Sequence, residues 1–115
     1  MRLKSRIWID AQLRRCLERG QFGAVIDKGA DEAGAVYVYI NHLDKTYDLL
    51  VPPPGPSHDD EGTRIFVKAF ASPVSWNEAS AFVAKQKKFD SDLWAIEIED
   101  KTGLAGLKIM TDAAK

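Results

Sequence analysis

The sequence predicts an α+β fold, a two-layer domain with a largely antiparallel sheet of five to six strands and two helices packed on one face. Three observations predict it. Two segments repeat apolar residues at helical spacing. Several short segments are β-branched or alternate apolar residues, as strands do. Connections between successive strands are mostly short, which favours antiparallel pairing. The expected order is α-β-β-β-β-α-β, and residues 1–115 are expected to form a single domain.

The first helix is expected from Ser5 to Glu18. Ser5 is a suitable N-cap residue, and Gly20 is suited to end the helix, because glycine readily adopts the left-handed conformation found there. The stripe that should face the sheet repeats at positions i, i+4, i+7 and i+8, and it consists of Ile9, Leu13, Cys16 and Leu17.

Three strands are expected next. Residues 22–28 are apolar and β-branched, and the turn at 29–34 has glycine at both ends. Residues 35–43 give the clearest strand, and because both of its sides are apolar or aromatic, we expect it to be central. A tight turn at Asp44-Lys45 then leads into residues 46–51, which complete a hairpin.

Prolines end this hairpin, because proline cannot donate a hydrogen bond to a neighbouring strand. The polar loop over residues 52–63 is expected to be mobile, and residues 64–70 form a further strand. Ser75 and Glu78 have the spacing of a capping box, so the second helix should begin there and run to about Lys88.

The last expected elements are a strand over residues 93–99 and a short edge strand within residues 103–110. In the strand over residues 93–99, we expect the apolar side chains to face inward and Glu97 and Glu99 to face outward. Residues 111–115 are expected to be a frayed tail. The inward side chains of the strand over residues 93–99 are those of Trp94, Ile96 and Ile98.

Composition excludes several classes of protein. No apolar run approaches the roughly 18 residues that span a bilayer, so no membrane segment is expected. The basic residues at the N-terminus precede no apolar core of a secretory signal, which favours a cytoplasmic location. A single cysteine rules out an internal disulfide and a cysteine-rich zinc site, and two histidines argue against a histidine-based metal site. We therefore expect no metal, and the absence of a phosphate-binding loop suggests no nucleotide cofactor.

Charge is distributed unevenly along the chain. Residues 1–20 contain six basic and two acidic side chains, a net charge of +4, whereas the remaining residues contain ten basic and fifteen acidic side chains, a net charge of −5. Such a split indicates either a contact surface for an acidic partner or complementarity between the first helix and the rest of the chain. The binding residues predicted on this helix are Arg6, Arg14, Arg15 and Arg19.

The residues with catalytic potential give no convincing site. Cys16 lies on the apolar stripe, where a small buried side chain is expected rather than an activated thiol. One alternative is a metal-dependent hydrolase or nuclease, in which Asp48 and Glu99 would hold the metal and Lys101 would stabilise charge. That hypothesis requires the three side chains to converge. No catalytic residue is assigned.

Three segments together carry a family resemblance. They are Arg2 to Cys16, which begins RLKSRIWIDA and continues LRRC, residues 29–34 leading into the strand at Ala35, and residues 89–100, which include FDSDLW and EIED. The chain resembles a family of short, uncharacterised, mainly alphaproteobacterial proteins known as a domain of unknown function. The resemblance implies a stand-alone cytoplasmic protein of this size, and it implies no activity, cofactor or catalytic residue.

These observations favour a non-enzymatic binding or interaction module that uses its basic first helix. The expected partner is an unknown protein with an acidic surface, and a second copy of the chain would also fit because most of the chain is acidic. A nucleic-acid-binding regulator is an alternative, although the overall net charge of −1 does not favour it.

Overall fold

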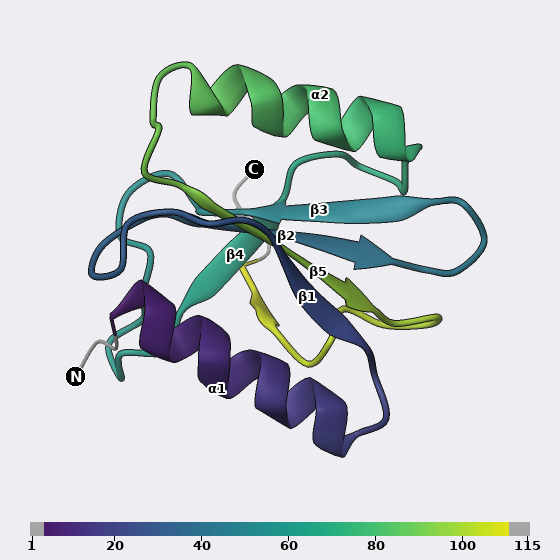
Figure 1. The fold of residues 1–115 in the computed structure, drawn as a ribbon, viewed down its shortest axis with the longest axis horizontal. Coiled ribbons are helices and arrows are strands. Elements are labelled where there is room, and N and C mark those ends of the chain that lie inside the picture. Colours follow the sequence, from purple (N-terminus) through teal and green to yellow (C-terminus); the bar gives the residue numbers. More distant parts are fainter. Residues whose placement is uncertain (1–3, 111–115) are drawn as a thin grey trace.

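In the computed structural model, which describes residues 4–110, two helices and six strands form a sheet covered on both faces (Figure 1). The strand order in the sheet is β1-β5-β2-β3-β4-β6. Along the chain, the elements are α1 (Ser5–Glu18), β1 (Gly23–Asp27), β2 (Val36–Asn41), β3 (Tyr47–Val51), β4 (Ile65–Lys68), α2 (Trp76–Lys87), β5 (Trp94–Glu99) and β6 (Lys108–Ile109).

The order of elements and the mostly antiparallel sheet confirm the prediction. The pairs β1–β5, β2–β3 and β3–β4 are antiparallel. The pair β2–β5 is parallel, with β5 lying between β1 and β2, and the edge pair β4–β6 is also parallel. β2 is a central strand, as its two apolar sides indicated.

The two helices lie on opposite faces of the sheet, so the prediction of two layers with both helices on one face is wrong (Figure 1). The reason lies in β2. Val38 and Ile40 pack with Ile9 and Cys16 of α1, whereas Tyr39 between them packs on the side of α2. Because successive side chains of a strand point to opposite faces, both faces carry apolar surface that must be covered.

The start of α1 differs from the prediction. Lys4, rather than Ser5, occupies the N-cap position, and its side chain makes no capping hydrogen bond. Ser5 is buried inside the first turn, where its hydroxyl donates to the carbonyl of Gly34 over 2.5 Å. Gln12 is buried on the same side of the helix and donates to the carbonyl of Ala105. These two polar anchors set the rotation of α1 and leave Leu17, which was expected in the apolar stripe, exposed.

The predicted end of α1 and the predicted cap of α2 are confirmed. Gly20 has a φ of +78°, and the N–H groups that follow the helix donate back to carbonyls of its last turn. At α2, the Ser75 hydroxyl accepts from the N–H of Glu78. The inward trio of β5 is buried as predicted, whereas the tail at residues 111–115 lies outside the described residues.

Within the polar loop at residues 52–63, residues 59–63 form a tight turn. The N–H of Asp59 donates to the carbonyl of Thr63, and the Asp59 carboxylate accepts from the N–H groups of Glu61 and Thr63. His58 and Arg64 pair across this turn as an isolated antiparallel bridge. This pairing places the two side chains next to each other, and the expected mobility of the loop stays a prediction.

Candidate binding sites

Three of the four arginines predicted as binding residues have partners within the chain. Arg6 lies 3.9 Å from carboxylates of Asp10 and Asp31, both as exposed ion pairs. Arg15 donates to the side-chain oxygen of Gln12 over 2.6 Å. Arg19 donates to the carbonyl of Ala105 over 2.8 Å, so it helps to hold the loop before β6 against α1.

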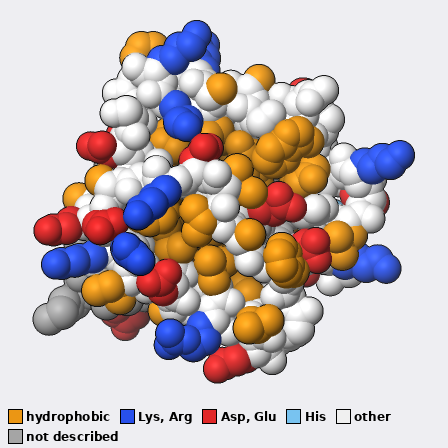
Figure 2. All heavy atoms as spheres, in the orientation of Figure 1, with side chains coloured by type: hydrophobic (Ala, Val, Ile, Leu, Met, Phe, Trp, Pro, Cys, Tyr) orange, Lys and Arg blue, Asp and Glu red, His pale blue; other side chains and the backbone are white. Residues whose placement is uncertain are grey.

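Arg14 is exposed, and it makes no hydrogen bond or ion pair with the side chains of residues 4–110. Two apolar side chains share its outward side of the helix, Ile7 with 51% and Leu17 with 72% of its surface exposed. Phe22, just beyond the helix, is 61% exposed. In Figure 2, basic, acidic and apolar side chains lie interspersed over the lower part of the face, where α1 runs.

The hypothesis of a metal-dependent hydrolase is wrong, because its residues do not converge. Asp48 pairs with Ile40, whose side chain faces α1. Glu99 pairs with Asn41, the next residue of β2, and therefore faces the opposite side of the sheet. Within residues 4–110, no group of three or more potential ligand side chains is arranged to hold a metal ion.

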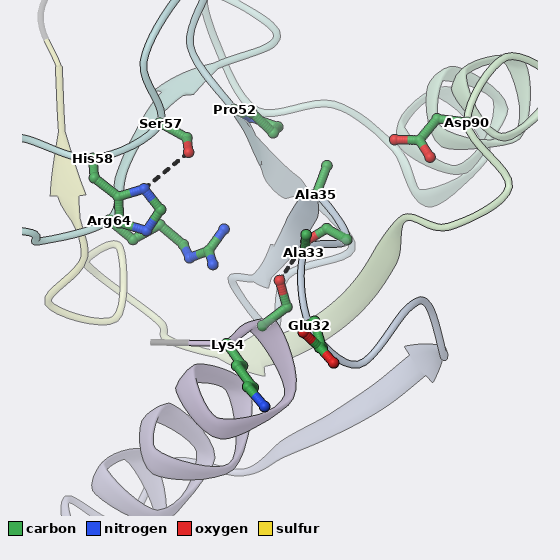
Figure 3. Close-up of a pocket in the computed structure, with 11 residues that line it drawn as sticks. Lys4, Glu32, Ala33, Ala35, Pro52, Ser57, His58, Arg64 and Asp90 are labelled. Carbon is green, nitrogen blue, oxygen red and sulfur yellow. Dashed lines mark hydrogen bonds between the residues drawn. The ribbon is translucent and has the colours of Figure 1, made fainter. Parts of the chain in front are cut away.

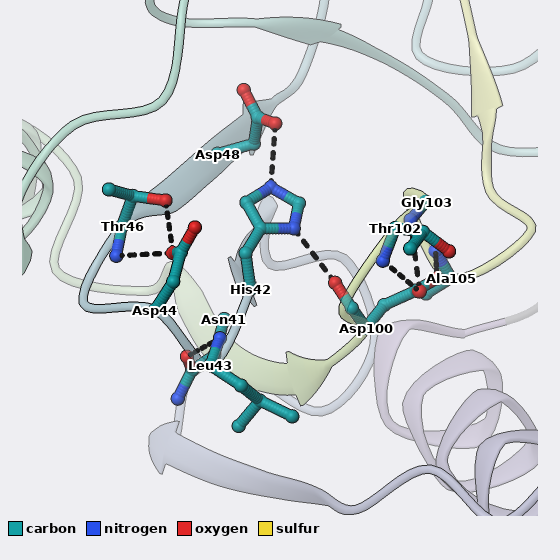
Figure 4. A network of polar contacts seen from close by, with 10 residues as sticks. All are labelled: Asn41, His42, Leu43, Asp44, Thr46, Asp48, Asp100, Thr102, Gly103 and Ala105. Atoms are coloured by element: carbon teal, nitrogen blue, oxygen red, sulfur yellow. Dashed lines mark hydrogen bonds and ion pairs between the residues drawn. The ribbon is translucent and has the colours of Figure 1, made fainter.

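Asp48 instead forms a buried pair with His42 (Figure 4). The Nε2 atom of His42 lies 2.9 Å from Asp48 Oδ2, and its Nδ1 atom lies 2.8 Å from the carbonyl oxygen of Asp100. A carboxylate and a carbonyl oxygen only accept, so both contacts are hydrogen bonds only when both ring nitrogens carry a proton. The arrangement thus favours the imidazolium form.

The environment of His42 agrees with this protonation state. Burial alone lowers its pKa, but the hydrogen bonds to Asp48 and to the carbonyl of Asp100, together with the charges of Asp48 and Asp44, raise the pKa above the ordinary value of 6.5. The second oxygen of Asp48, Oδ1, is buried and has no hydrogen-bond partner among the described residues. A cleft of about 410 Å³ lies beside this pair and is also lined by Lys68 and the loop before β6.

The same network continues into that loop. The carboxylate of Asp100 accepts hydrogen bonds from the N–H groups of Thr102, Gly103 and Ala105. Burial raises the pKa of Asp100, and these backbone hydrogen bonds outweigh the burial and lower it. The network therefore ties the end of β5 to β2 and β3.

A second cleft, of about 420 Å³, opens at the N-terminal end of α1 (Figure 3). Arg64, only 8% exposed, lies with its guanidinium carbon 5.2 Å from the centre of the Trp8 ring. Beside it, the Ser57 hydroxyl and His58 Nδ1 are 3.0 Å apart. In Figure 3, the guanidinium of Arg64 points into the space between Ser57 and the first turn of α1.

Sequence reasoning missed this second cleft. Arg64 was only the first residue of an expected strand, and nothing in its neighbourhood in the sequence indicates that the guanidinium is buried. His58 lies in the loop that the sequence predicts to be mobile, and the bridge to Arg64 pairs its backbone with the strand side of that loop. One sequence signal for this cleft is the pair of polar residues Ser57 and His58. They lie at one end of a turn whose other end is followed by the basic residue Arg64.

Comparison with known proteins finds a matching family model and similar solved structures. A family model described as a protein of unknown function (DUF1491) matches residues 3–108. The solution structure of a protein from A. tumefaciens is 36% identical, covers 96% of both chains and superimposes with a TM-score of 0.82. A crystal structure of a DUF1491 family protein from Caulobacter crescentus is 26% identical, covers 94% of this chain and 99% of that chain, and gives a TM-score of 0.76. A search of curated proteins found no match.

Proposed function

The chain belongs to the DUF1491 family of proteins of unknown function, and from this premise we propose that it is a non-enzymatic binding module whose contact surface is the outward side of α1. We define the α1 surface as Ile7, Arg14, Leu17 and Phe22. The observation that carries the proposal is the exposure of two large apolar side chains, Leu17 and Phe22, next to an arginine with no partner among the described residues.

Energetics support a protein partner for this surface. Burying one large apolar side chain in an interface stabilises a complex by about 1.5–3 kcal/mol before the costs of association. Aromatic residues and arginine are also the residue types enriched at the centres of protein interfaces. Leu17, Phe22 and Arg14 would therefore form the centre of the contact, and the partner would present apolar side chains and a carboxylate.

The partner's acidity follows from the charge of α1. Arg6 and Arg15 keep their positive charge at the surface although each has a partner within the chain, so the field around the helix stays positive. An acidic partner would be attracted to this field, and its association would weaken as salt screens the charges. A second copy of the chain is one such partner, since the remainder of the chain is acidic.

The first test is sedimentation of the purified protein at two salt concentrations, followed by capture of partners from a lysate of the source bacterium. We expect the double variant Arg14→Glu/Leu17→Ser to lose either the dimer or the captured partner, and high salt to weaken both. Lys68→Glu is the matched control, because it changes an exposed basic residue on β4. Retention of the same partner or dimer by the double variant would contradict the proposal.

Whether the α1 surface binds nucleic acid is tested in a separate experiment. Labelled single- and double-stranded nucleic acids are titrated with protein at two salt concentrations, and fluorescence anisotropy is measured. Salt-dependent binding that disappears in Arg14→Glu/Arg15→Glu would identify the α1 surface as a phosphate-contacting one and would overturn the protein partner. No binding of wild-type protein at low salt removes this alternative.

A cytoplasmic location is also part of the proposal. It is supported by the family resemblance and by the single cysteine, which is buried and free in the structure. No helix within residues 4–110 is long and apolar enough to cross a membrane. Fractionation of cells that express a tagged protein would test the location directly.

A further inference from the structure

We infer that β1 pairs with β1 of a second copy of the chain, so that the two sheets join edge to edge. The inference rests on the proposed function, because it names a second copy as the partner and places Leu17 and Phe22 of the α1 surface beside the contact. β1 is the first strand in the order of the sheet, and it pairs with β5 on one side (Figure 1). Within residues 4–110, no strand covers its other edge.

The backbone of β1 presents hydrogen-bonding groups along this open edge. The carbonyl of Phe22 accepts from the N–H of Glu99, so the backbone groups of Phe22 point toward β5. Because backbone groups alternate between the two sides of a strand, those of Gly23 and Val25 point to the open edge. Groups arranged in this way are a template for another extended strand, which donates and accepts hydrogen bonds at the same spacing.

The two edges of the sheet differ in their protection against such pairing. At the opposite edge, β6 has two residues, and its Lys108 lies 2.6 Å from a carboxylate oxygen of Asp59. Short edge strands and lysines are common means of preventing sheets from joining. β1 has five residues, and residues 20–26 contain no charged residue and no proline. The sequence of β1 is therefore that of an edge open to pairing.

Exposed apolar side chains gather at the same edge. Of the eight large apolar side chains that are exposed among residues 4–110, half belong to residues 17–26, namely Leu17, Phe22, Val25 and Ile26. Val25 is 43% exposed and Ile26 is 42% exposed, although both belong to a strand. A second strand at this edge would cover them, and removal of this apolar surface from water would favour the contact.

α1 extends this apolar surface. Leu13 packs on Gly23 so closely that a Cβ atom at Gly23 would lie 2.7 Å from Leu13 Cδ2. Leu17 follows Leu13 by one turn and shares its side of the helix, and its side chain is 72% exposed. The α1 surface and the open edge of β1 are thus neighbouring parts of one contact region.

A two-fold axis at Ala24 gives a self-complementary register. Gly23 of each copy then lies opposite Val25 of the other, and the outward backbone groups of both residues exchange hydrogen bonds. Gly23 and Val25 lie opposite two buried isoleucines of β5 that pack with α1, so their Cα substituents share the α1 side of the sheet. Val25 of one copy would therefore pack beside Leu13 of the other copy, over the glycine that has no side chain of its own.

Charge also suits a second copy. When a strand that contains charges pairs with itself, like charges come close together and destabilise the pair. Residues 20–26 contain none. Asp27, the first charged residue after them, lies 3.2 Å from Lys87 of α2 and would come opposite the uncharged Gln21. The net charge of the whole chain is −1, so long-range repulsion between two copies is weak.

The first experiment is sedimentation equilibrium of the wild-type chain between about 1 μM and 1 mM. We expect a reversible dimer whose share rises with concentration. A monomer throughout this range would overturn the inference and leave the α1 surface to a different partner.

Hydrogen exchange of the backbone amides locates the contact. In a concentrated sample, the N–H groups of Gly23 and Val25 should exchange at least about tenfold more slowly than in a dilute one. The N–H of Ala24 faces β5 in both states, so its exchange should change less. Equal exchange of Gly23 and Val25 in the two samples, when the concentrated one contains dimer, would overturn the pairing through β1.

Val25→Lys tests the edge with the residue type that protects natural edges. Val25 is partly exposed, so the variant should fold, which circular dichroism verifies, and its dimer should be weaker by at least about tenfold. Met110→Lys is the matched control, because Met110 is 40% exposed and follows β6 at the opposite edge. It should dimerise as wild type does. An unchanged dimer in Val25→Lys, or its loss in Met110→Lys, would contradict the inference.

Ala24→Cys tests the register. In the inferred pairing, the two copies of residue 24 form a pair without mutual hydrogen bonds, with Cα atoms about 4.5 Å apart, a separation that a disulfide can span. Oxidation should give a covalent dimer on a non-reducing gel. The wild type should give none, because its single cysteine, Cys16, is buried. No cross-link in a sample shown to contain dimer would overturn this register.

These variants also separate the inference from the proposed function. Loss of the dimer in both Val25→Lys and Arg14→Glu/Leu17→Ser would support both. A dimer that survives Val25→Lys but is lost in the double variant would support the α1 surface and overturn the pairing through β1. The reverse result would support the pairing through β1 and contradict the α1 surface.

Discussion

His42 Nε2 and Asp48 Oδ2 are 2.9 Å apart in a pair that joins the end of β2 to β3. Because His42 Nδ1 also contacts the carbonyl of Asp100, a single ring bridges three strands of the sheet. Only 12% of the His42 side chain and 5% of the Asp48 side chain are exposed, so water replaces these hydrogen bonds poorly. The charge state of His42 should therefore affect the stability of the fold.

The first prediction is a loss of stability as pH rises through the folded-state pKa of His42. This pKa is raised above 6.5, so the folded protein binds the imidazole proton more tightly than the unfolded chain does. The resulting stabilisation is fully present below about pH 6.5 and is lost as the pH rises through the higher folded value. Urea unfolding between about pH 5.5 and 9 will measure it, a range in which tyrosines and lysines keep their protons.

The matched variant is His42→Gln, whose amide remains able to donate to Asp48 but does not titrate. We expect its free energy of unfolding to be lower than that of wild type by roughly 3 kcal/mol at pH 6, because it leaves a buried carboxylate with a weaker partner. We also expect its stability to change less across the same pH range. An equal slope in both proteins would show that another group is responsible.

The second prediction concerns Trp94 of β5. It is 3% exposed, and its indole N–H donates to the carbonyl of Ala30 over 2.7 Å. Trp94→Ala should lower the free energy of unfolding by about 3–5 kcal/mol. Phe82→Ala should cost less than that, because Phe82 is only partly buried at the edge of the cluster under α2. Urea unfolding compares the two, and an equal loss would contradict the burial argument.

Sequence reasoning located most elements because their signals are local. The helical spacing of Ile9 and Cys16, the capping box at Ser75 and the alternation in β5 each depend on a few neighbouring residues. The two apolar sides of β2 indicate more than a central strand, because they also require a covering helix on each face of the sheet. The general lesson is that a strand with two apolar sides requires two covering layers.

The sites were less predictable, because they bring together residues far apart in the chain. His42 and Asp100 are 58 positions apart, and Trp8 and Arg64 are 56 positions apart in the sequence. Serine is a residue type that often caps a helix, yet Ser5 is buried against Gly34, because the turn at residues 29–34 packs on the start of α1. Local patterns contain no information about these contacts, which depend on the way the sheet is assembled.

The third prediction uses the contrast between the two serines at the helix starts. Ser75 caps α2 at the surface, so Ser75→Ala should cost about 1 kcal/mol. Ser5 makes a buried hydrogen bond, and Ser5→Ala would leave the carbonyl of Gly34 without that donor, at a cost of roughly 1–3 kcal/mol. Thermal or urea unfolding of both variants tests the order, and a larger loss for Ser75→Ala would show that Ser5 contributes little.

The last prediction concerns Gly34, whose backbone packs against the chain before β5. A Cβ atom at this position would clash with the carbonyl oxygen of Asp92 and press on the Trp94 ring. The clash is with backbone, which is held in place by the hydrogen bond from Ala30 N–H to the same oxygen. We therefore expect Gly34→Ala to destabilise the fold by more than about 3 kcal/mol, at or beyond the upper end of the usual cost of overpacking.

The control is Gly55→Ala, because it isolates the effect of backbone conformation from the effect of space. Gly55 has a φ of +84° and open space around its Cβ position, so alanine there should cost only about 1 kcal/mol. Gly34 is not in the left-handed region, so its cost would come from the close approach alone. Urea unfolding of the two variants, monitored by tryptophan fluorescence, compares them directly, and equal stability would mean that the Asp92 segment can move away from Gly34.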